Sequence, residues 1–126
     1  MGKDDTRQRI CDAAVELLSE KWYSVVSVAD ICRTAGLSNG IFYTYFRNKE
    51  ELIRGLIEQY LEVLEESVRG IRGESRVEML GAFVRAVFRV AHDHPDLLSI
   101  YREGQYRFYE YEQRVRALYT AGLERI

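Results

Sequence analysis

The residues between Ile31 and Lys49 have the side-chain types expected of a surface that binds a polyanion. This stretch holds no aspartate or glutamate, and it carries Arg33, Arg47 and Lys49. The formal net charge of the whole chain is -2, and its acidic side chains gather elsewhere, as in Glu62, Glu65, Glu66, Glu74 and Glu78. A basic stretch within a weakly acidic protein suggests one face that meets a polyanion such as nucleic acid.

Other kinds of chemistry find little support in the sequence. We see no paired carboxylates, no nucleophile beside a base and no phosphate-cradling loop in a plausible context, so we do not expect an enzyme. Metal-ligand residue types occur at His92, Asp93, His94 and Asp96, but Pro95 stands among them and such residues are usual at a helix end. Cys11 and Cys32 form no CxxC pair and lie on apolar helical positions, which favours buried packing. We expect no metal and no cofactor.

The composition indicates one small, mainly helical protein. The chain has 126 residues, of which 47% are apolar and 30% charged, with a single proline. Apolar residues recur at helical spacing almost throughout, which predicts an all-α fold. No apolar run approaches the roughly 18 residues of a membrane span, and the charged N-terminus is unlike a signal peptide. We therefore expect a cytoplasmic protein without a membrane partner.

A helix-turn-helix is predicted over the stretch SVADICRTAGLSNGIFYTYFRNK, residues 27–49. Ser27 and Asp30 have the spacing of a capping box that starts a short helix. Gly36 is suited to the left-handed turn that ends this helix, and Ser38 to the N-cap of the next one. Such a unit presents its second helix to the major groove of DNA. The expected exposed positions of that helix are polar, small or aromatic: Ser38, Asn39, Gly40, Ile41, Tyr43, Thr44 and Tyr45.

The rest of the chain predicts a second helical domain. Asn48 and Glu51 cap a long helix that Gly70 and Gly73 break, and Ser75 with Glu78 opens another. Pro95 suits the first turn of a short helix that we expect Gly104 to close. The apolar pattern is still running at Ile126, so we expect the protein to be truncated there. We place a DNA-binding domain at residues 1–48 and a second helical domain at residues 49–126, which the family resemblance described next implies is part of a ligand-binding and dimerisation domain.

The run AGLSNGIFYTYFRNKEEL, with the preceding RICDAAVELLSEKWYSVVSVADI, resembles the TetR family of transcription regulators over roughly residues 7 to 57. The resemblance implies a three-helix bundle with a helix-turn-helix, followed by a helical regulatory domain. It further implies a repressor that binds a palindromic operator in double-stranded DNA as a homodimer and responds to a small-molecule effector. It assigns phosphate contacts to Ser27, Tyr43, Tyr45 and Lys49, base-edge contacts to Ser38, Asn39, Gly40 and Ile41, and either role to Thr44.

Three residues depart from the pattern of that family. Trp22 stands where a glycine commonly ends the first helix, and Thr44 replaces a frequent histidine. Ile41 replaces a common threonine and keeps a methyl surface suited to a thymine methyl. These departures leave the predicted fold in place but blur the operator sequence.

Aromatic side chains are dense in the second half of the chain. In proteins resembling this one, the helices after the DNA-binding module enclose a small-molecule pocket, and tyrosines there would suit an aromatic or cationic ligand. The candidate ligand-binding residues are Tyr60, Phe83, Tyr101, Tyr106, Phe108 and Tyr109.

Two alternative functions stay open. A helical protein-interaction module without DNA binding would use the helix-turn-helix only as scaffold, and the acidic side chains of residues 58–78 would fit a protein partner. The absence of acids from residues 31–49 argues against it, because a scaffold would not require that absence. A small enzyme is the second alternative. Catalytic turnover that is lost when His92 or His94 is mutated would support it.

Overall fold

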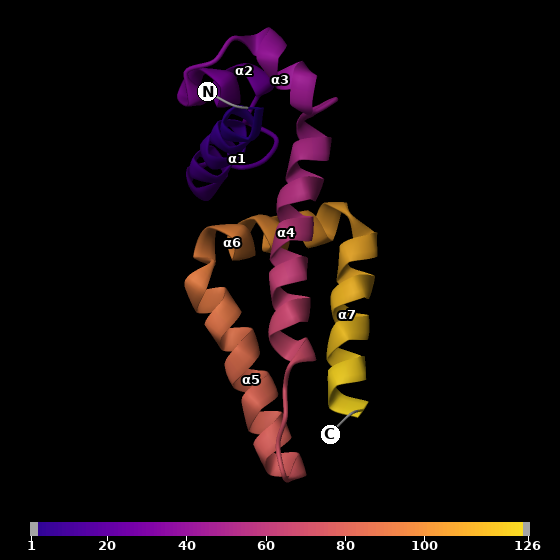
Figure 1. Cartoon of the computed structure of the whole chain (residues 1–126). Helices are drawn as coiled ribbons and strands as arrows, with labels where there is room; N and C mark the ends of the chain where they lie inside the picture. Colours follow the sequence, from indigo (N-terminus) through magenta and orange to yellow (C-terminus); the bar gives the residue numbers. More distant parts are fainter. Residues whose placement is uncertain (1–2, 125–126) are drawn as a thin grey trace. The chain divides into compact units, whose positions relative to one another are not determined.

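The computed structural model describes residues 3–124, without the side chains of Lys3, Asp4, Gln105 and Tyr106. Every regular element in this part of the chain is an α-helix (Figure 1), so the all-α prediction is confirmed. The chain divides into two compact units, Met1–Leu56 and Ile57–Ile126, and each is described on its own. The helices are α1 (Lys3–Glu20), α2 (Val28–Ala35), α3 (Asn39–Tyr45), α4 (Lys49–Arg69), α5 (Arg76–Asp93), α6 (Pro95–Arg107) and α7 (Tyr109–Glu124).

The N-terminal unit packs α1, α2, α3 and the first turns of α4 around one apolar core. Its innermost side chains come from all of these helices and from the connector before α2, so that each short helix is held by its neighbours. Burial of this kind compensates for the weak intrinsic stability of helices as short as α2 and α3. The most buried members of this core are Ile10, Ala14, Val26, Ile31, Cys32, Phe42 and Leu52.

Local signals in the sequence set the ends of α2. The Ser27 hydroxyl accepts a hydrogen bond from the Asp30 amide, and the Asp30 carboxylate accepts one from the Ser27 amide, both at 3.0 Å. The predicted capping box is therefore confirmed. Gly36 has a φ of 72°, the left-handed conformation that ends α2, and its amide donates to the carbonyls of Arg33 and Cys32. Arg9 of α1 donates to the Ala35 carbonyl beside this turn, which joins the first helix to the motif.

The start of α4 uses a related cap. The Glu51 amide donates to the Asn48 side-chain oxygen at 2.8 Å, and the Glu51 carboxylate accepts from the amide of Arg47. Ser75 and Glu78 repeat this pattern at α5, where the Glu78 carboxylate accepts from the Glu74 amide. In both places the reciprocal bond reaches one residue further back than in the box at Ser27.

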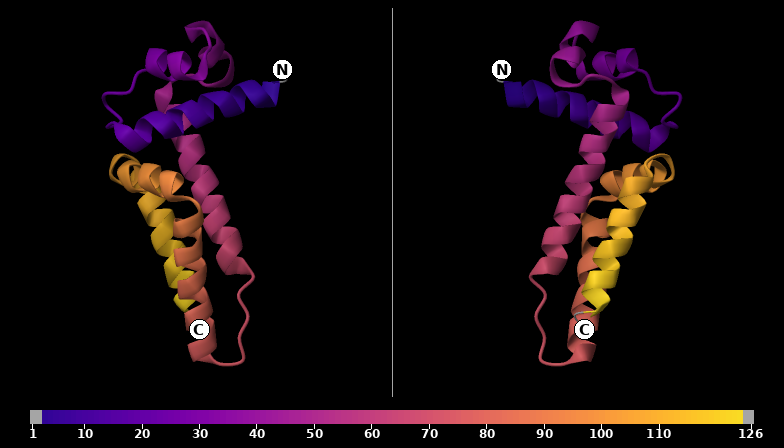
Figure 2. Two further views of the ribbon diagram at one scale, coloured as in Figure 1. Left: turned by 90° about the vertical axis from the view of Figure 1, so that its left-hand side faces the viewer. Right: turned by 90° about the vertical axis from the view of Figure 1, so that its right-hand side faces the viewer.

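The C-terminal unit is built from the later part of α4 with α5, α6 and α7. Helices α5 and α7 flank α4, and α6 links them at one end (Figures 1 and 2). Val68, Phe83 and Ala86 form an apolar cluster between α4 and α5, with Leu118 and Tyr119 of α7 packed against it. Arg114 of α7 donates to the carboxylates of Glu58 and Glu65, which ties α7 to α4.

Gly104 does not end a helix, contrary to the sequence prediction. Helix α6 continues to Arg107, and Gly104 lies within it. A Cβ at Gly104 would overlap the Cδ1 atom of Ile57, so α6 approaches α4 closely at this glycine and any larger residue would require the Ile57 side chain to shift. Gly122 has the same role in α7, where a Cβ would overlap the ring of Phe83. Sequence alone does not distinguish a glycine that ends a helix from one that lets two helices touch.

Across residues 3–124, none of the helices combines the length and the apolar character that crossing a membrane requires. Among those residues, no three His, Cys, Asp or Glu side chains group as a metal site would need.

Candidate nucleic-acid interface

Helices α2 and α3, joined by the turn at Gly36, form a helix-turn-helix whose second helix turns most of its side chains outward. Phe42 is fully buried and anchors α3 to the core, while Tyr43 is 58% exposed. Ser38 occupies the N-cap position of α3 as predicted, but its hydroxyl makes no cap hydrogen bond. The predicted base-reading residues Ser38, Asn39, Gly40 and Ile41 are all exposed, and so is Thr44.

Aromatic packing fixes the orientation of this surface. The rings of Phe42 and Tyr43 meet edge to face with centroids 5.3 Å apart, and Phe42 also contacts Phe46. The guanidinium of Arg7 lies 5.0 Å from the centroid of Phe46, which adds a contact from α1. Tyr45 is half-buried at the other side of α3. The exposed face of α3 thus belongs to a helix whose opposite face is buried against the core through Phe42, and such packing holds a recognition helix in place.

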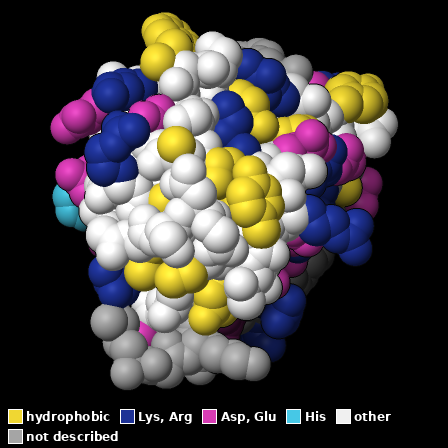
Figure 3. Space-filling model, turned by 90° about the horizontal axis from the view of Figure 1, so that it is seen from above, with side chains coloured by type: hydrophobic (Ala, Val, Ile, Leu, Met, Phe, Trp, Pro, Cys, Tyr) yellow, Lys and Arg dark blue, Asp and Glu magenta, His cyan; other side chains and the backbone are white. Residues whose placement is uncertain are grey.

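The charges around this face are partly neutralised within the protein. Arg33 pairs with Asp30 at 3.2 Å. The Asp30 carboxylate accepts from the Ser27 amide and from Arg33. The hydrogen bond from the Ser27 backbone is the main reason why the pKa of the Asp30 carboxyl lies below its usual value. Figure 3 looks onto the N-terminal unit from the side of α2 and α3. Apolar and uncharged side chains fill the middle of that face, and Lys, Arg and acidic side chains lie around it.

Lys49 lies at the first position of α4 with its ammonium turned into the unit. Its Nζ donates to the carbonyls of Tyr23 at 2.7 Å and Val26 at 2.8 Å. The same atom lies 4.0 Å from the centroid of the Tyr23 ring. Lys49 therefore holds the connector between α1 and α2 against the start of α4. Its predicted contact with a phosphate stays a prediction.

The connector before α2 exposes two large apolar side chains. Trp22 is 75% exposed and Val25 is 63% exposed. The sequence drew attention to Trp22 only as a departure from a family pattern, and nothing in the periodicity marked Val25. Single exposed apolar side chains are normal on a protein surface, so these two alone do not define a binding site.

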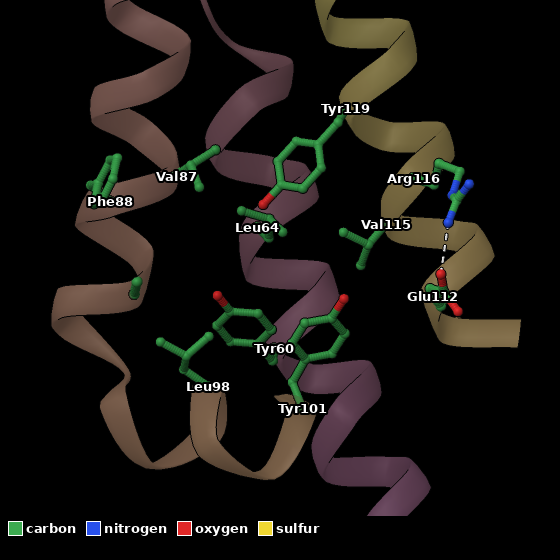
Figure 4. Close-up of a pocket in the computed structure, with 11 residues that line it drawn as sticks. Tyr60, Leu64, Val87, Phe88, Leu98, Tyr101, Glu112, Val115, Arg116 and Tyr119 are labelled. Carbon is green, nitrogen blue, oxygen red and sulfur yellow. Dashed lines mark hydrogen bonds and ion pairs between the residues drawn. The ribbon is translucent and has the colours of Figure 1, made fainter. Parts of the chain in front are cut away.

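A cavity of about 470 Å³ lies in the C-terminal unit, within the range of small-molecule sites. Three tyrosines line it (Figure 4), namely Tyr60 of α4, Tyr101 of α6 and Tyr119 of α7. The rings of Tyr60 and Tyr101 stack with centroids 5.4 Å apart and planes inclined by 22°. The apolar part of the lining comprises Leu64, Val87, Phe88, Ala91, Leu98 and Val115.

Burial raises the pKa of the three phenols that line this cavity. It raises the pKa of Tyr60 and of Tyr119 above the usual tyrosine value. For Tyr101, burial together with the neighbouring Tyr119, Tyr60 and Glu112 raises the pKa to about 12. A tyrosine is already protonated at neutral pH, so these raised values move ionisation of the three phenols further into the alkaline range.

Two of the six predicted ligand-binding residues, Tyr60 and Tyr101, line the cavity. Phe83 and Phe108 are buried elsewhere, Phe83 against Tyr119 and Phe108 against Tyr111. Tyr109 is 66% exposed, and the side chain of Tyr106 is outside the described part of the structure. The sequence prediction left out the α7 side of the lining. Helical spacing could have found it, because Glu112, Val115, Arg116 and Tyr119 recur on one face of α7.

These features define a helix-turn-helix protein with a separate helical unit that contains a cavity. Residues 10–56 match the model of bacterial regulatory proteins, tetR family. The chain is 29% identical over 99 residues to the uncharacterised HTH-type transcriptional regulator YvdT of Bacillus subtilis, which covers 77% of this chain and 51% of that protein. It is 30% identical over 106 residues to the probable HTH-type transcriptional regulator YttP of the same organism, covering 80% and 51%.

Solved structures share the fold. A TetR family transcription regulator from Marinobacter aquaeolei superposes with a TM-score of 0.70 at 22% identity, over 96% of this chain and 66% of that chain. A transcriptional regulator from Aquifex aeolicus superposes with a TM-score of 0.71 at 24% identity, over 95% and 72%. The family match thus covers the N-terminal module, and the solved structures extend the likeness of fold to the rest of the chain. The chain spans about half the length of the curated relatives YvdT and YttP.

Proposed function

We propose that this protein is a sequence-specific transcription regulator that inserts α3 into the major groove of double-stranded DNA. One observation carries the proposal: the N-cap Ser38 and the α3 residues Asn39, Gly40, Ile41 and Thr44 are exposed and uncharged, while the buried Phe42 anchors the helix to the core. A short helix with one face buried in the core and an exposed, uncharged opposite face is typical of a recognition helix that enters the major groove. Tyr43 and Tyr45 flank this front and would donate to phosphates.

Each exposed residue suits a particular part of the duplex. The amide of Asn39 pairs in bidentate fashion with adenine, and Ile41 offers a methyl surface to thymine. Ser27 at the N-cap of α2 would meet a phosphate, where a helix N-terminus favours negative charge. In the family, two such heads act together, so we propose a homodimer on a palindromic operator. A dimer bound to that operator would repress transcription. The protein would act in the cytoplasm.

Regulation would come from the tyrosine-lined cavity. Helix α4 begins at Lys49, beside α3, and further along it contributes Tyr60 and Leu64 to the cavity lining. A small molecule that binds better when α4 is in a DNA-incompatible position would release the operator. The match of residues 10–56 to the family supports the proposed binding to DNA. The effector and the homodimer are proposed from the likeness to longer relatives.

The test is binding to DNA from upstream of the protein's own gene, followed by fluorescence anisotropy of the labelled duplex across a salt series. We expect sequence-selective binding whose affinity falls steeply with salt, because each neutralised phosphate releases counterions. Replacing Asn39 and Tyr43 with alanine should abolish it, whereas Tyr109→Ala, which changes an equally exposed tyrosine of the other unit, should not. Wild-type binding that is equal for unrelated DNA would contradict the proposal and favour a protein-interaction module.

A further inference from the structure

Helix α5 carries apolar side chains on two of its faces. One face lies in the core of the C-terminal unit through Phe83, Ala86 and Val90. The second face exposes four large apolar side chains at the three-and-four spacing that aligns residues along a helix. We name these residues the α5 stripe: Val77, Leu80, Val84 and Phe88, which are 81%, 43%, 43% and 71% exposed.

The α5 stripe is continuous, and this sets it apart from single exposed apolar side chains. From Val77 to Phe88 it follows three turns of the helix, roughly 16 Å at the rise of an α-helix. A surface helix ordinarily buries its one apolar stripe and turns polar residues toward water. A contiguous apolar patch that stays exposed marks a surface of association.

The charges beside the stripe suit a second copy of the same helix. Glu78, Arg85 and Arg89 are exposed and follow one another at spacings of seven and four residues, so they lie along one flank of the stripe. When two copies of a helix pack antiparallel about a two-fold axis, this flank of one copy faces the same flank of the other. Glu78 of each copy then lies beside Arg85 of its counterpart.

Glu78 can accept this second partner. Its carboxylate accepts a hydrogen bond from the Glu74 amide at 2.8 Å, and a carboxylate has two oxygens with capacity for several such bonds. The arginines are at the opposite end of the flank, so an antiparallel arrangement brings unlike charges together twice, once on each side of the two-fold axis.

The apolar residues match in the same register. Val77 of one copy lies against Phe88 of the other, and Leu80 lies against Val84. Each copy supplies both members of every pair, so the contact is self-complementary and closes with two chains, as a two-fold interface requires.

We infer that the α5 stripe is a self-association surface through which two copies of this chain pair antiparallel. The inference rests on the proposed function only for its use at a palindromic operator. A contact three turns long is smaller than the roughly 800 Å² per partner that is typical of stable complexes. The expected dimer is therefore weak, with a dissociation constant in the micromolar range.

Sedimentation equilibrium of the full chain without DNA, across the micromolar range, tests the inference. Leu80→Gln should raise the dissociation constant at least about tenfold, because both copies lose an apolar contact. Leu123→Gln changes a similarly exposed leucine of α7 outside the stripe and should leave the constant unchanged. If Leu80→Gln does not fold, Val77→Gln alters the most exposed position of the stripe instead. A chain that stays monomeric, or a dimer that the folded stripe variant leaves unchanged, would overturn the inference.

Charge reversal tests the antiparallel arrangement. Glu78→Lys and Arg85→Glu should each weaken self-association at least about fivefold, because like charges would then face each other. An equimolar mixture of the two variants should recover the wild-type constant, since unlike charges meet again between the two chains. Circular dichroism checks that both variants fold, as Glu78 also belongs to the cap of α5. A mixture no tighter than its folded components would contradict antiparallel pairing.

Two further measurements separate other outcomes. An apolar stripe beside arginines could also lie on an anionic membrane surface. A monomeric chain that cosediments with phosphatidylglycerol vesicles, and no longer does so in Leu80→Gln, would overturn self-pairing in favour of that surface. Selective DNA binding by a chain that stays monomeric would contradict the inference alone. Stripe-dependent dimers without selective DNA binding would support it and contradict the proposed regulator.

Discussion

The ammonium of Lys49 lies 4.0 Å above the ring of Tyr23 and donates a 2.7 Å hydrogen bond to the carbonyl of the same residue. With its second bond to the Val26 carbonyl, Lys49 joins the connector before α2 to the start of α4. A residue at this position was predicted to grip a phosphate. In the structure its ammonium binds the connector that precedes the helix-turn-helix. A phosphate contact would be an additional role.

Lys49→Met should therefore destabilise the N-terminal unit even without DNA. Loss of charge-assisted hydrogen bonds and of the cation–π contact at a half-buried site predicts a fall of about 1–3 kcal/mol in the free energy of unfolding. Urea unfolding monitored by the fluorescence of Trp22, the single tryptophan, measures it in this unit. Lys21→Met is the matched control, since Lys21 is exposed. An unchanged unfolding free energy in Lys49→Met would contradict the structural role.

Gly40→Ala should separate DNA binding from folding. A Cβ at Gly40 would have nothing within 4 Å in the free protein, and the residue lacks a left-handed φ. Alanine should leave stability unchanged or raise it by up to about 1 kcal/mol. If α3 lies against base edges, the added methyl group would meet DNA, and we expect at least about tenfold weaker binding in the anisotropy assay.

Gly70→Ala is the control for that experiment, because a Cβ there also meets open space but lies outside the proposed interface. Full DNA affinity in Gly40→Ala would show that α3 does not approach the duplex closely at this point.

Glu65→Gln should weaken the link between α7 and α4 and alter the response to acid. Arg114 donates to Glu65 at 2.8 Å, and this bond is the main reason why the pKa of Glu65 is lowered. A lowered folded-state pKa gives stability that is present above the unfolded value of about 4.5 and is lost as pH falls through the folded-state value.

The variant should therefore lose about 0.5–1 kcal/mol at neutral pH, a modest amount because the pair is partly exposed. Its stability should also fall less between pH 5 and pH 3 than that of the wild type, by urea unfolding at each pH. Glu62→Gln, at an exposed position of α4, provides the comparison. An acid response identical to that of the wild type would argue against this ion pair.

Tyr101 should titrate late in alkaline solution. Its pKa of about 12 compares with about 10 for an unperturbed tyrosine. Because the folded-state pKa is raised, the corresponding stability is complete below pH 10 and is lost as pH rises through about 12. Ultraviolet absorbance of tyrosinate measures the titration. Tyr101→Phe should remove part of the late-titrating amplitude, and an unchanged late amplitude would contradict the buried position of this phenol.

Local signals predicted much of the fold. The cap formed by Ser27 and Asp30 and the turn at Gly36 depend on hydrogen bonds within a few residues, so spacing alone identifies them. Gly104 was misread as a helix end because its role depends on Ile57, which is distant in sequence. The cavity lining was only partly predicted, because spacing groups Tyr119 with Val115 on one face of α7, whereas tertiary packing decides that this face lines the cavity.

The central claim, that α3 reads base sequence, is tested most directly by selecting duplexes from a random pool with the wild-type chain and with Asn39→Ala. We predict that the wild type enriches an inverted repeat, and that the variant loses preference at one position of each half-site, with a discrimination loss of about 1–3 kcal/mol. Tyr109→Ala should enrich the same repeat as the wild type. Enrichment of one unchanged sequence by the wild type and Asn39→Ala alike, or of none by the wild type, would contradict the account.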